Sequence, residues 1–107
     1  MVEITYHRRY HRLTAKGHAH SGEKGHDLVC ASVSALMLTM AANVGSLATQ
    51  ESVREPIIHL AEGDAEVACK SSHRMTNVVT LMFDTVCTGF AMLQDLYPEN
   101  ISYEVLD

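Results

Sequence analysis

Residues 29–47, VCASVSALMLTMAANVGSL, carry the clearest structural signal in the chain. Apolar side chains recur there at steps of three and four residues, which is the spacing of one face of an α-helix. Asp27 stands just before this stretch, where its carboxylate would accept the free amide hydrogens of the first turn as an N-cap. We expect Gly45 to end the helix. The apolar stripe consists of Val29, Val33, Leu36, Met37, Met40, Val44 and Leu47.

Strand patterns and a second helix surround this segment. A second helical stripe predicts a helix over residues 73–96, capped by Ser72 and stopped by Pro98. This stripe consists of Met75, Val78, Val79, Met82, Val86, Phe90, Leu93 and Leu96. Alternating or β-branched runs predict strands at residues 2–7, 10–16, 53–60, 65–70 and 101–106. The order ββαββαβ favours an α+β fold, with a mainly antiparallel sheet and both helices packed on one of its faces.

The composition favours one small soluble domain over residues 1–107. The chain has 107 residues, of which 47% are apolar, and a formal net charge of −5. Its longest uncharged stretch is interrupted by polar side chains, so we expect no membrane span, and no secretory signal is visible. Three widely spaced cysteines form no disulfide framework, which favours a reducing, cytoplasmic setting.

Cys30 differs from the other two cysteines because it is expected in the first helical turn. Free amides and the positive end of the helix dipole stabilise a thiolate at that position. The preceding residues 17–26 are predicted to form a mobile loop, with Gly17, Gly22 and Gly25 as its flexible points. This loop brings three histidines close in sequence, so a Cys–His pair is one interpretation and a small buried cysteine is the other. These histidines are His18, His20 and His26, and we expect Cys69 and Cys87 to be buried and inert.

Two other uses of these residues stay open. His18-x-His20 and His26-x₃-Cys30 offer nitrogen and sulfur ligands to zinc, but no second cysteine lies near, and we expect no metal site. Residues 1–26 also carry a local charge of +3, while the remainder carries −8. This basic segment fits either a solvated surface or a contact patch for RNA or an acidic partner. The residues of that patch would be His7, Arg8, Arg9, His11 and Arg12.

Two linked motifs carry a family resemblance. Residues 17–19 read GHA and residues 25–36 read GHDLVCASVSAL, with His18 placed twelve positions before Cys30. The pattern strongly resembles that of the ribosomal-processing cysteine proteases, the Prp family, in which a G-H-A motif precedes G-x-D-[IV]-V-C-A and a serine follows the cysteine by four residues. Leu28 replaces the more usual isoleucine.

The resemblance implies both an activity and residue roles. It implies a homodimeric cysteine endopeptidase without a cofactor, which removes a short N-terminal extension from a basic large-subunit ribosomal protein. By position, Cys30 would be the nucleophile and His18 the general base, with Asp27 and Ser34 in supporting roles. Nucleic acid would not be required. The alternative is a non-enzymatic ribosome-assembly or RNA-contact module that uses the basic first quarter of the chain.

Overall fold

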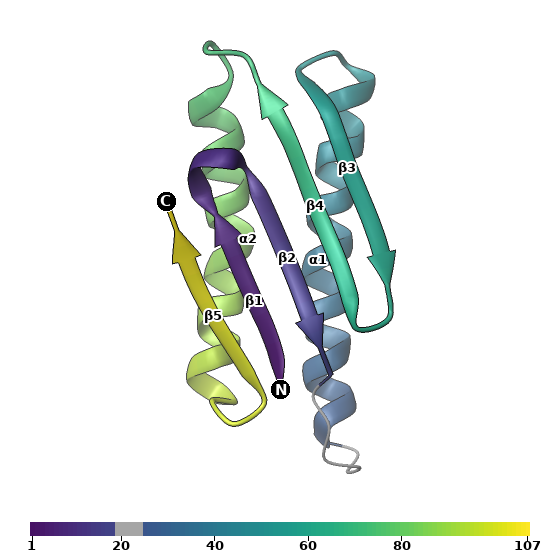
Figure 1. The fold of residues 1–107 in the computed structure, drawn as a ribbon, viewed down its shortest axis with the longest axis vertical. Coiled ribbons are helices and arrows are strands. Elements are labelled where there is room, and N and C mark those ends of the chain that lie inside the picture. The colour runs from purple at the N-terminus through teal and green to yellow at the C-terminus, as the bar shows by residue number, and fades with distance from the viewer. Residues whose placement is uncertain (19–24) are drawn as a thin grey trace.

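The computed structural model of the chain describes residues 1–18 and 25–107, and for residues 25–27 it describes the backbone alone. The described elements follow the predicted order ββαββαβ (Figure 1). The strands are β1 (Val2–His7), β2 (Arg12–Gly17), β3 (Val53–Ala61), β4 (Asp64–Ser71) and β5 (Ile101–Leu106). The helices are α1 (Gly25–Thr49) and α2 (Thr76–Leu96), and a short 3₁₀ helix, η1 (Arg8–Tyr10), joins β1 to β2.

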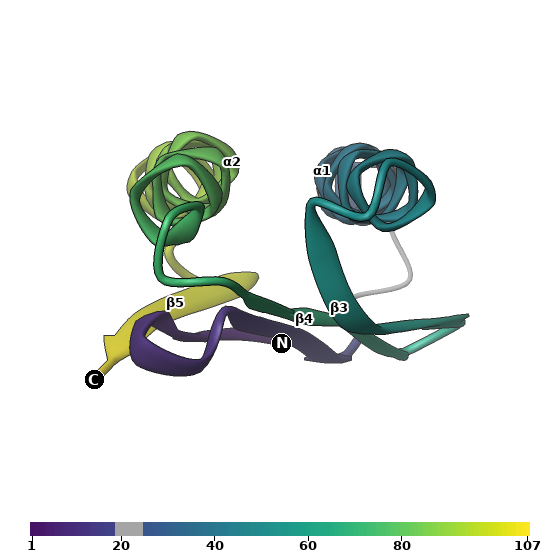
Figure 2. The same cartoon turned by 90° about the horizontal axis from the view of Figure 1, so that it is seen from above.

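The strands form one sheet in the order β3-β4-β2-β1-β5. Every neighbouring pair is antiparallel except β1 and β5, which run parallel. Figure 2 shows both helices on the same face of the sheet. The α+β class, the mainly antiparallel sheet and the one-sided helix layer are therefore confirmed.

The core lies between the sheet and the helices. Strand β1 turns Val2, Ile4 and Tyr6 inward, because side chains alternate between the two faces of a strand. The Tyr6 ring stacks on Phe83 of α2 with ring centroids 5.4 Å apart. Phe83 was missing from the predicted second stripe, which is wrong at two other positions. Val78 and Leu96 are exposed on the outer side of α2 (49% and 67%), because the buried stripe runs through Val79, Phe83, Val86, Cys87 and Phe90.

Helix α1 is longer than predicted at both ends. It begins at Gly25, so Asp27 lies inside the first turn and is not the N-cap. Gly45 does not end the helix, which continues to Thr49. A methyl group at Gly45 would lie 3.7 Å from the Ile58 Cδ1 atom of β3, so tertiary packing holds this part of the helix in place.

Helix α2 begins three residues later than predicted, at Thr76, and Ser72 is not its N-cap. Met75 occupies that position without a side-chain cap hydrogen bond. Ser72 contributes its carbonyl oxygen instead, which accepts hydrogen bonds from the Met75 amide (3.0 Å) and from the Thr76 hydroxyl (3.0 Å). The turn before α2 is thus closed on the Ser72 carbonyl by one backbone and one side-chain donor.

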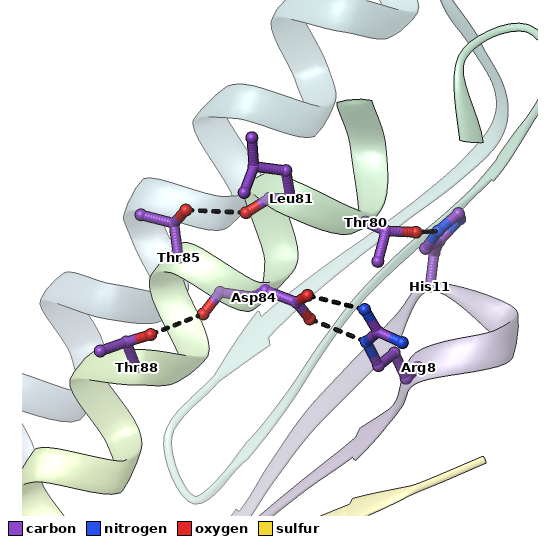
Figure 3. A network of polar contacts seen from close by, with 7 residues as sticks. All are labelled: Arg8, His11, Thr80, Leu81, Asp84, Thr85 and Thr88. Atoms are coloured by element: carbon purple, nitrogen blue, oxygen red, sulfur yellow. Dashed lines mark hydrogen bonds and ion pairs between the residues drawn. The ribbon is translucent and has the colours of Figure 1, made fainter. Parts of the chain in front are cut away.

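The connection between β1 and β2 is anchored on α2. Arg8 donates two hydrogen bonds to the Asp84 carboxylate, at 3.1 and 3.0 Å, and the His11 ring lies 2.7 Å from the Thr80 hydroxyl (Figure 3). His11 is only 5% exposed and stacks on Phe83. The predicted surface patch therefore does not include His11, since tertiary packing buries its ring.

Both helices are apolar enough to cross a membrane by length and composition, with mean hydropathies of 1.7 and 1.3. Our exclusion of a membrane span on polarity alone was therefore too strong. In the fold, each helix lays its apolar stripe on the sheet, as a core helix does.

Candidate active site

Cys30 is the most exposed of the three cysteines. It is half-buried at the edge of the core, whereas Cys69 and Cys87 are 3% and 2% exposed. Burial raises the pKa of the Cys69 thiol to about 11, and burial is also the main cause that raises the pKa of Cys87 to about 11. Both thiols are therefore protonated at neutral pH. The prediction that these two cysteines are buried is confirmed, and their lack of reactivity stays a prediction.

Cys30 lines a pocket of about 440 Å³ between α1 and the hairpin of β3 and β4. Three of the residues with predicted catalytic or supporting roles, His18, Cys30 and Ser34, share this pocket, and Gly17 of the predicted loop lines it as well. Cys30 and Ser34 come from successive turns of α1, and His18 follows the end of β2. The pocket thus brings together residues from the end of β2 and from α1, with His18 and Cys30 twelve positions apart in the sequence.

Gly63 holds open the space beside the His18 imidazole. A methyl group at Gly63 would overlap the His18 ring, and Gly63 has a φ of +72°, which favours glycine. The backbone on either side of His18 is fixed as well. The Gly17 amide donates to the Gly63 carbonyl at 2.9 Å, and the Met1 amino group donates to the His18 carbonyl at 2.7 Å.

Cys30 is the sixth residue of α1, so our placement of this residue in the first turn was wrong. Its own amide hydrogen belongs to the intrahelical ladder and is not free. The amides that lack a partner within the helix are those of residues 25–27, one turn earlier. Helical side chains lean toward the N-terminus, so the thiol still extends toward the positive end of the dipole.

The glycines assigned to the mobile loop divide between other elements. Gly17 is the last residue of β2 and has a φ of +94°, and Gly25 is the first residue of α1. Both are tied to regular structure, so their assignment to the loop was wrong. Gly22 and His20 lie outside the described residues, as do the side chains of His26 and Asp27.

No group of three or more potential metal ligands occurs within residues 1–18 and 28–107, whose side chains the structure describes. Two histidines of the alternative zinc site lie outside those ranges.

The hairpin contributes pocket residues that we did not predict, namely Leu60, Glu62 and Gly63. Leu60 is 42% exposed, and with Leu38 of α1, which is 56% exposed, it offers an apolar lining. Glu62 is exposed beside them. No sequence motif marks these residues, because they reach the site only through the pairing of β3 with β4. The glycine in the turn was the one available signal.

The two acidic residues at the turn between β3 and β4 differ in whether a basic side chain lies beside the carboxylate. Asp64 pairs with Lys16 and lies 3.4 Å from His59, and the hydrogen bond from Lys16 is the main cause that lowers the pKa of its carboxyl. Glu62 forms no ion pair with any residue that the structure describes. Among the described residues, Glu62 therefore places a negative charge without an ion-pair partner at the rim of the pocket.

The chain is similar to one family and to several solved structures. The family model described as "Cysteine protease Prp" matches residues 1–102. The "Ribosomal processing cysteine protease Prp" of Mycoplasma pneumoniae is 32% identical over 106 residues, covering 97% of this chain and 94% of that protein.

Solved structures of two other proteins resemble this fold. The ribosomal processing protease Prp from S. aureus, in complex with a substrate peptide, has a TM-score of 0.68 and 26% identity, covering 97% of this chain and 96% of the other. The same protease in complex with a covalently linked product peptide matches equally well. SMU.848 from Streptococcus mutans has a TM-score of 0.67 at 23% identity, with 98% and 91% covered, and shows the shared fold alone.

Proposed function

The chain belongs to the Prp family of ribosomal processing cysteine proteases, and from that premise we propose that it removes a short N-terminal extension from a basic large-subunit ribosomal protein. The observation that carries the proposal is the shared pocket, in which Cys30, the least buried of the three cysteines, is joined by His18. Family membership disfavours the non-enzymatic alternative.

The proposed chemistry is acyl transfer through a thioester. His18 takes the proton of the Cys30 thiol, and the thiolate attacks the scissile carbonyl carbon to form a tetrahedral oxyanion. His18 then gives the proton to the departing amine as the C–N bond breaks. Water attacks the thioester and transfers a proton to His18, and the C–S bond breaks to release the acid. His18 then returns its proton to the Cys30 sulfur, which restores the thiol. This scheme needs only side chains and water, so no cofactor takes part.

The S. aureus complex with a covalently linked product peptide supports a covalent route of this kind. The oxyanion needs hydrogen-bond donors other than the Cys30 amide, which is bonded within the helix. The amides of residues 25–27 lack a partner within the helix and lie at the end of α1 toward which the Cys30 side chain leans. We assign the stabilisation of the oxyanion to this first turn.

Supporting roles fall to Ser34 and Asp27. Ser34 lies one turn after Cys30 on the same pocket wall, and its hydroxyl has no hydrogen-bond partner among the described residues. It is therefore available to hold a substrate backbone group. Asp27 keeps the supporting role that its family position implies. We propose no role for nucleic acid in the cleavage step.

The pocket suits a substrate segment that is apolar near the cleavage point and basic beside it. Leu38 and Leu60 supply apolar contact area, and Glu62 supplies a negative charge at the rim. A basic ribosomal protein has the opposite charge, which favours encounter. Three free cysteines suit a reducing cytoplasm.

We further propose that the protein is a homodimer. Large apolar side chains of α2 stand exposed away from the core, including Leu81 and Met92 at 66% and 59%. Burying them between two copies would remove that apolar surface from water. Sedimentation equilibrium tests this, and a monomer at micromolar concentration would contradict it.

The test of function is cleavage of the host's large-subunit ribosomal protein carrying an N-terminal extension, followed by mass spectrometry. We expect Cys30→Ala to abolish cleavage and His18→Ala to reduce it at least a hundredfold, since these variants lack the nucleophile and the base.

Cys69→Ala is the matched control, because it removes a thiol of the same size from a buried position. We expect that variant to cleave at the wild-type rate wherever it remains folded. Full activity of Cys30→Ala would end the proposal.

A further inference from the structure

A second and larger cavity lies at the other end of the strands that frame the pocket of Cys30. Strand β2 starts at this cavity with Arg12 and ends at the Cys30 pocket with Gly17, and β4 runs between the same two places in the opposite direction. The cavity measures about 780 Å³. The proposed proteolysis does not use it.

The lining of this cleft is basic in an acidic protein. Four cationic side chains border it against the single carboxylate of Glu55, while the whole chain carries −5. They are Arg9, Arg12, Arg54 and Lys70.

Two of these cations are already paired and two are not. Arg12 lies 3.1 Å from Glu66, and Lys70 lies 3.1 Å from Glu55. Arg9 and Arg54 are exposed and form no ion pair with any residue in the described part of the chain. Two unpaired guanidinium groups in one cleft create a local positive potential that attracts an anion.

An exposed aromatic ring and the start of a helix share this cleft. Tyr10 lines it and is 64% exposed. Thr76, the first residue of α2, also lines it, and α2 has neither a side-chain cap nor an acidic residue in its first turn. The helix start adds partial positive charge to that of the arginines.

The backbone on the outer wall of the cleft is irregular. The pairing of β3 with β4 shifts register between Arg54 and Ile57, and within this shift Glu55 has a φ of +49°. Bulges of this kind re-aim side chains at the edge of a sheet. Regular pairing resumes from Ile57 onward, so the irregularity is confined to the segment that presents Arg54 to the cleft.

We propose that this cleft binds single-stranded RNA. Arginines that pair with phosphates and an exposed ring on which a base stacks are the two elements by which proteins hold single strands without reading their sequence. An acidic peptide would satisfy the arginines but would leave the Tyr10 ring without a planar partner. The site is independent of Cys30 and would let the protein contact RNA while its other end holds a peptide.

The test is fluorescence anisotropy of the full chain with a fluorescein-labelled ten-nucleotide uridine strand, at potassium chloride concentrations from about 50 to 200 mM. We expect binding that weakens as salt rises. Arg9→Gln/Arg54→Gln should weaken binding about tenfold or more at low salt. It should also lower the magnitude of the log–log salt slope by about 1.4, or 0.7 for each phosphate contact. Tyr10→Ala should weaken binding severalfold and leave the slope unchanged.

The matched control is Asn43→Asp/Gln94→Glu, which lowers the net charge by the same two units through isosteric changes. Neither residue lines the cleft, and the carboxylate introduced at position 94 would still accept the Tyr103 amide that Gln94 accepts at 2.7 Å. We expect this control to bind RNA within twofold of wild type, and every variant to cleave a short peptide normally.

Three outcomes would overturn the proposal. They are absence of RNA binding, an equal loss in the control and the arginine variant, and displacement of the RNA by a ten-residue glutamate peptide at equal concentration. If the Tm of the arginine double variant is far below that of the wild type, the binding measured for Tyr10→Ala decides whether the site is correct. Unchanged RNA binding by Tyr10→Ala would then reject the site.

Discussion

At the scale of single residues, the three cysteines show how burial gives chemically identical thiols different reactivities. Cys69 and Cys87 are screened from water and have raised pKa values, whereas Cys30 lines a pocket. Thiolate is the reactive species, so a thiol with a pKa of about 11 is almost wholly unreactive at neutral pH.

We therefore expect iodoacetamide to alkylate Cys30 alone in the folded protein near pH 6. His18→Ala should slow this reaction, because the thiol loses its proton acceptor. Peptide mass mapping identifies the labelled residue. In guanidinium chloride at neutral or mildly alkaline pH all three cysteines should react alike, and modification of Cys69 in the native protein would contradict the prediction.

Gly63 supports the site at the same scale. Gly63→Ala should lower kcat/KM at least tenfold, because its methyl group would overlap the His18 ring and displace it. The left-handed φ of +72° should also cost about 1 kcal/mol of stability. Peptide cleavage and urea unfolding measure the two effects.

Gly45→Ala is the control for that substitution. Its new methyl group would meet Ile58 at an ordinary contact distance of 3.7 Å within a helix. We expect a stability gain of about 0.5–1 kcal/mol with unchanged activity. Equal losses of activity in the two glycine variants would show that Gly63 has no special place beside His18.

At the scale of elements, the β1–β2 connection is held on α2 by Arg8 and His11 (Figure 3). Burial is the main cause that lowers the pKa of His11 below its ordinary value of 6.5. The native ring therefore stays neutral at a pH where the unfolded chain already binds a proton.

Stability should consequently fall as the pH drops below about 6.5 and should level off below the native pKa of His11. We expect His11→Gln to be less stable near pH 7.5 but to lose less stability on acidification. Urea unfolding at pH 5 to 8 measures this difference, and parallel curves for the two proteins would contradict it.

At the scale of the whole molecule, charge is divided between two ends. The cleft lined by Arg9 and Arg54 is basic, whereas the chain as a whole carries −5 and the catalytic pocket has Glu62 at its rim. A basic protein substrate and an RNA strand would therefore be drawn to different ends of the same sheet.

For the protease reaction, kcat/KM on the basic protein substrate should fall as salt rises from about 10 to 150 mM, because the Debye length shrinks and opposite charges attract less. Cleavage of a short neutral peptide should change little. Equal salt sensitivity for the two substrates would show that net charge does not guide the encounter.

The sequence by itself determined the element order and the chemical candidates. Apolar residues recur at every second position in β1 and every three or four positions in α1. Both spacings follow from local backbone geometry, so they could be recognised without knowledge of tertiary contacts. The motif around His18 and Cys30 indicated the family for a similar reason, since residue type and spacing are visible in one dimension.

Only the tertiary structure decided which residues meet. Long-range packing decides where α1 starts, buries His11 and sets the buried stripe of α2 through Phe83. Strand register decides that Leu60, Glu62 and Gly63 line the pocket. Local propensity is weak beside the free energy of burying apolar surface and pairing strands, so these contacts override it. The same long-range pairing places a basic cleft and a catalytic pocket at opposite ends of β2 and β4.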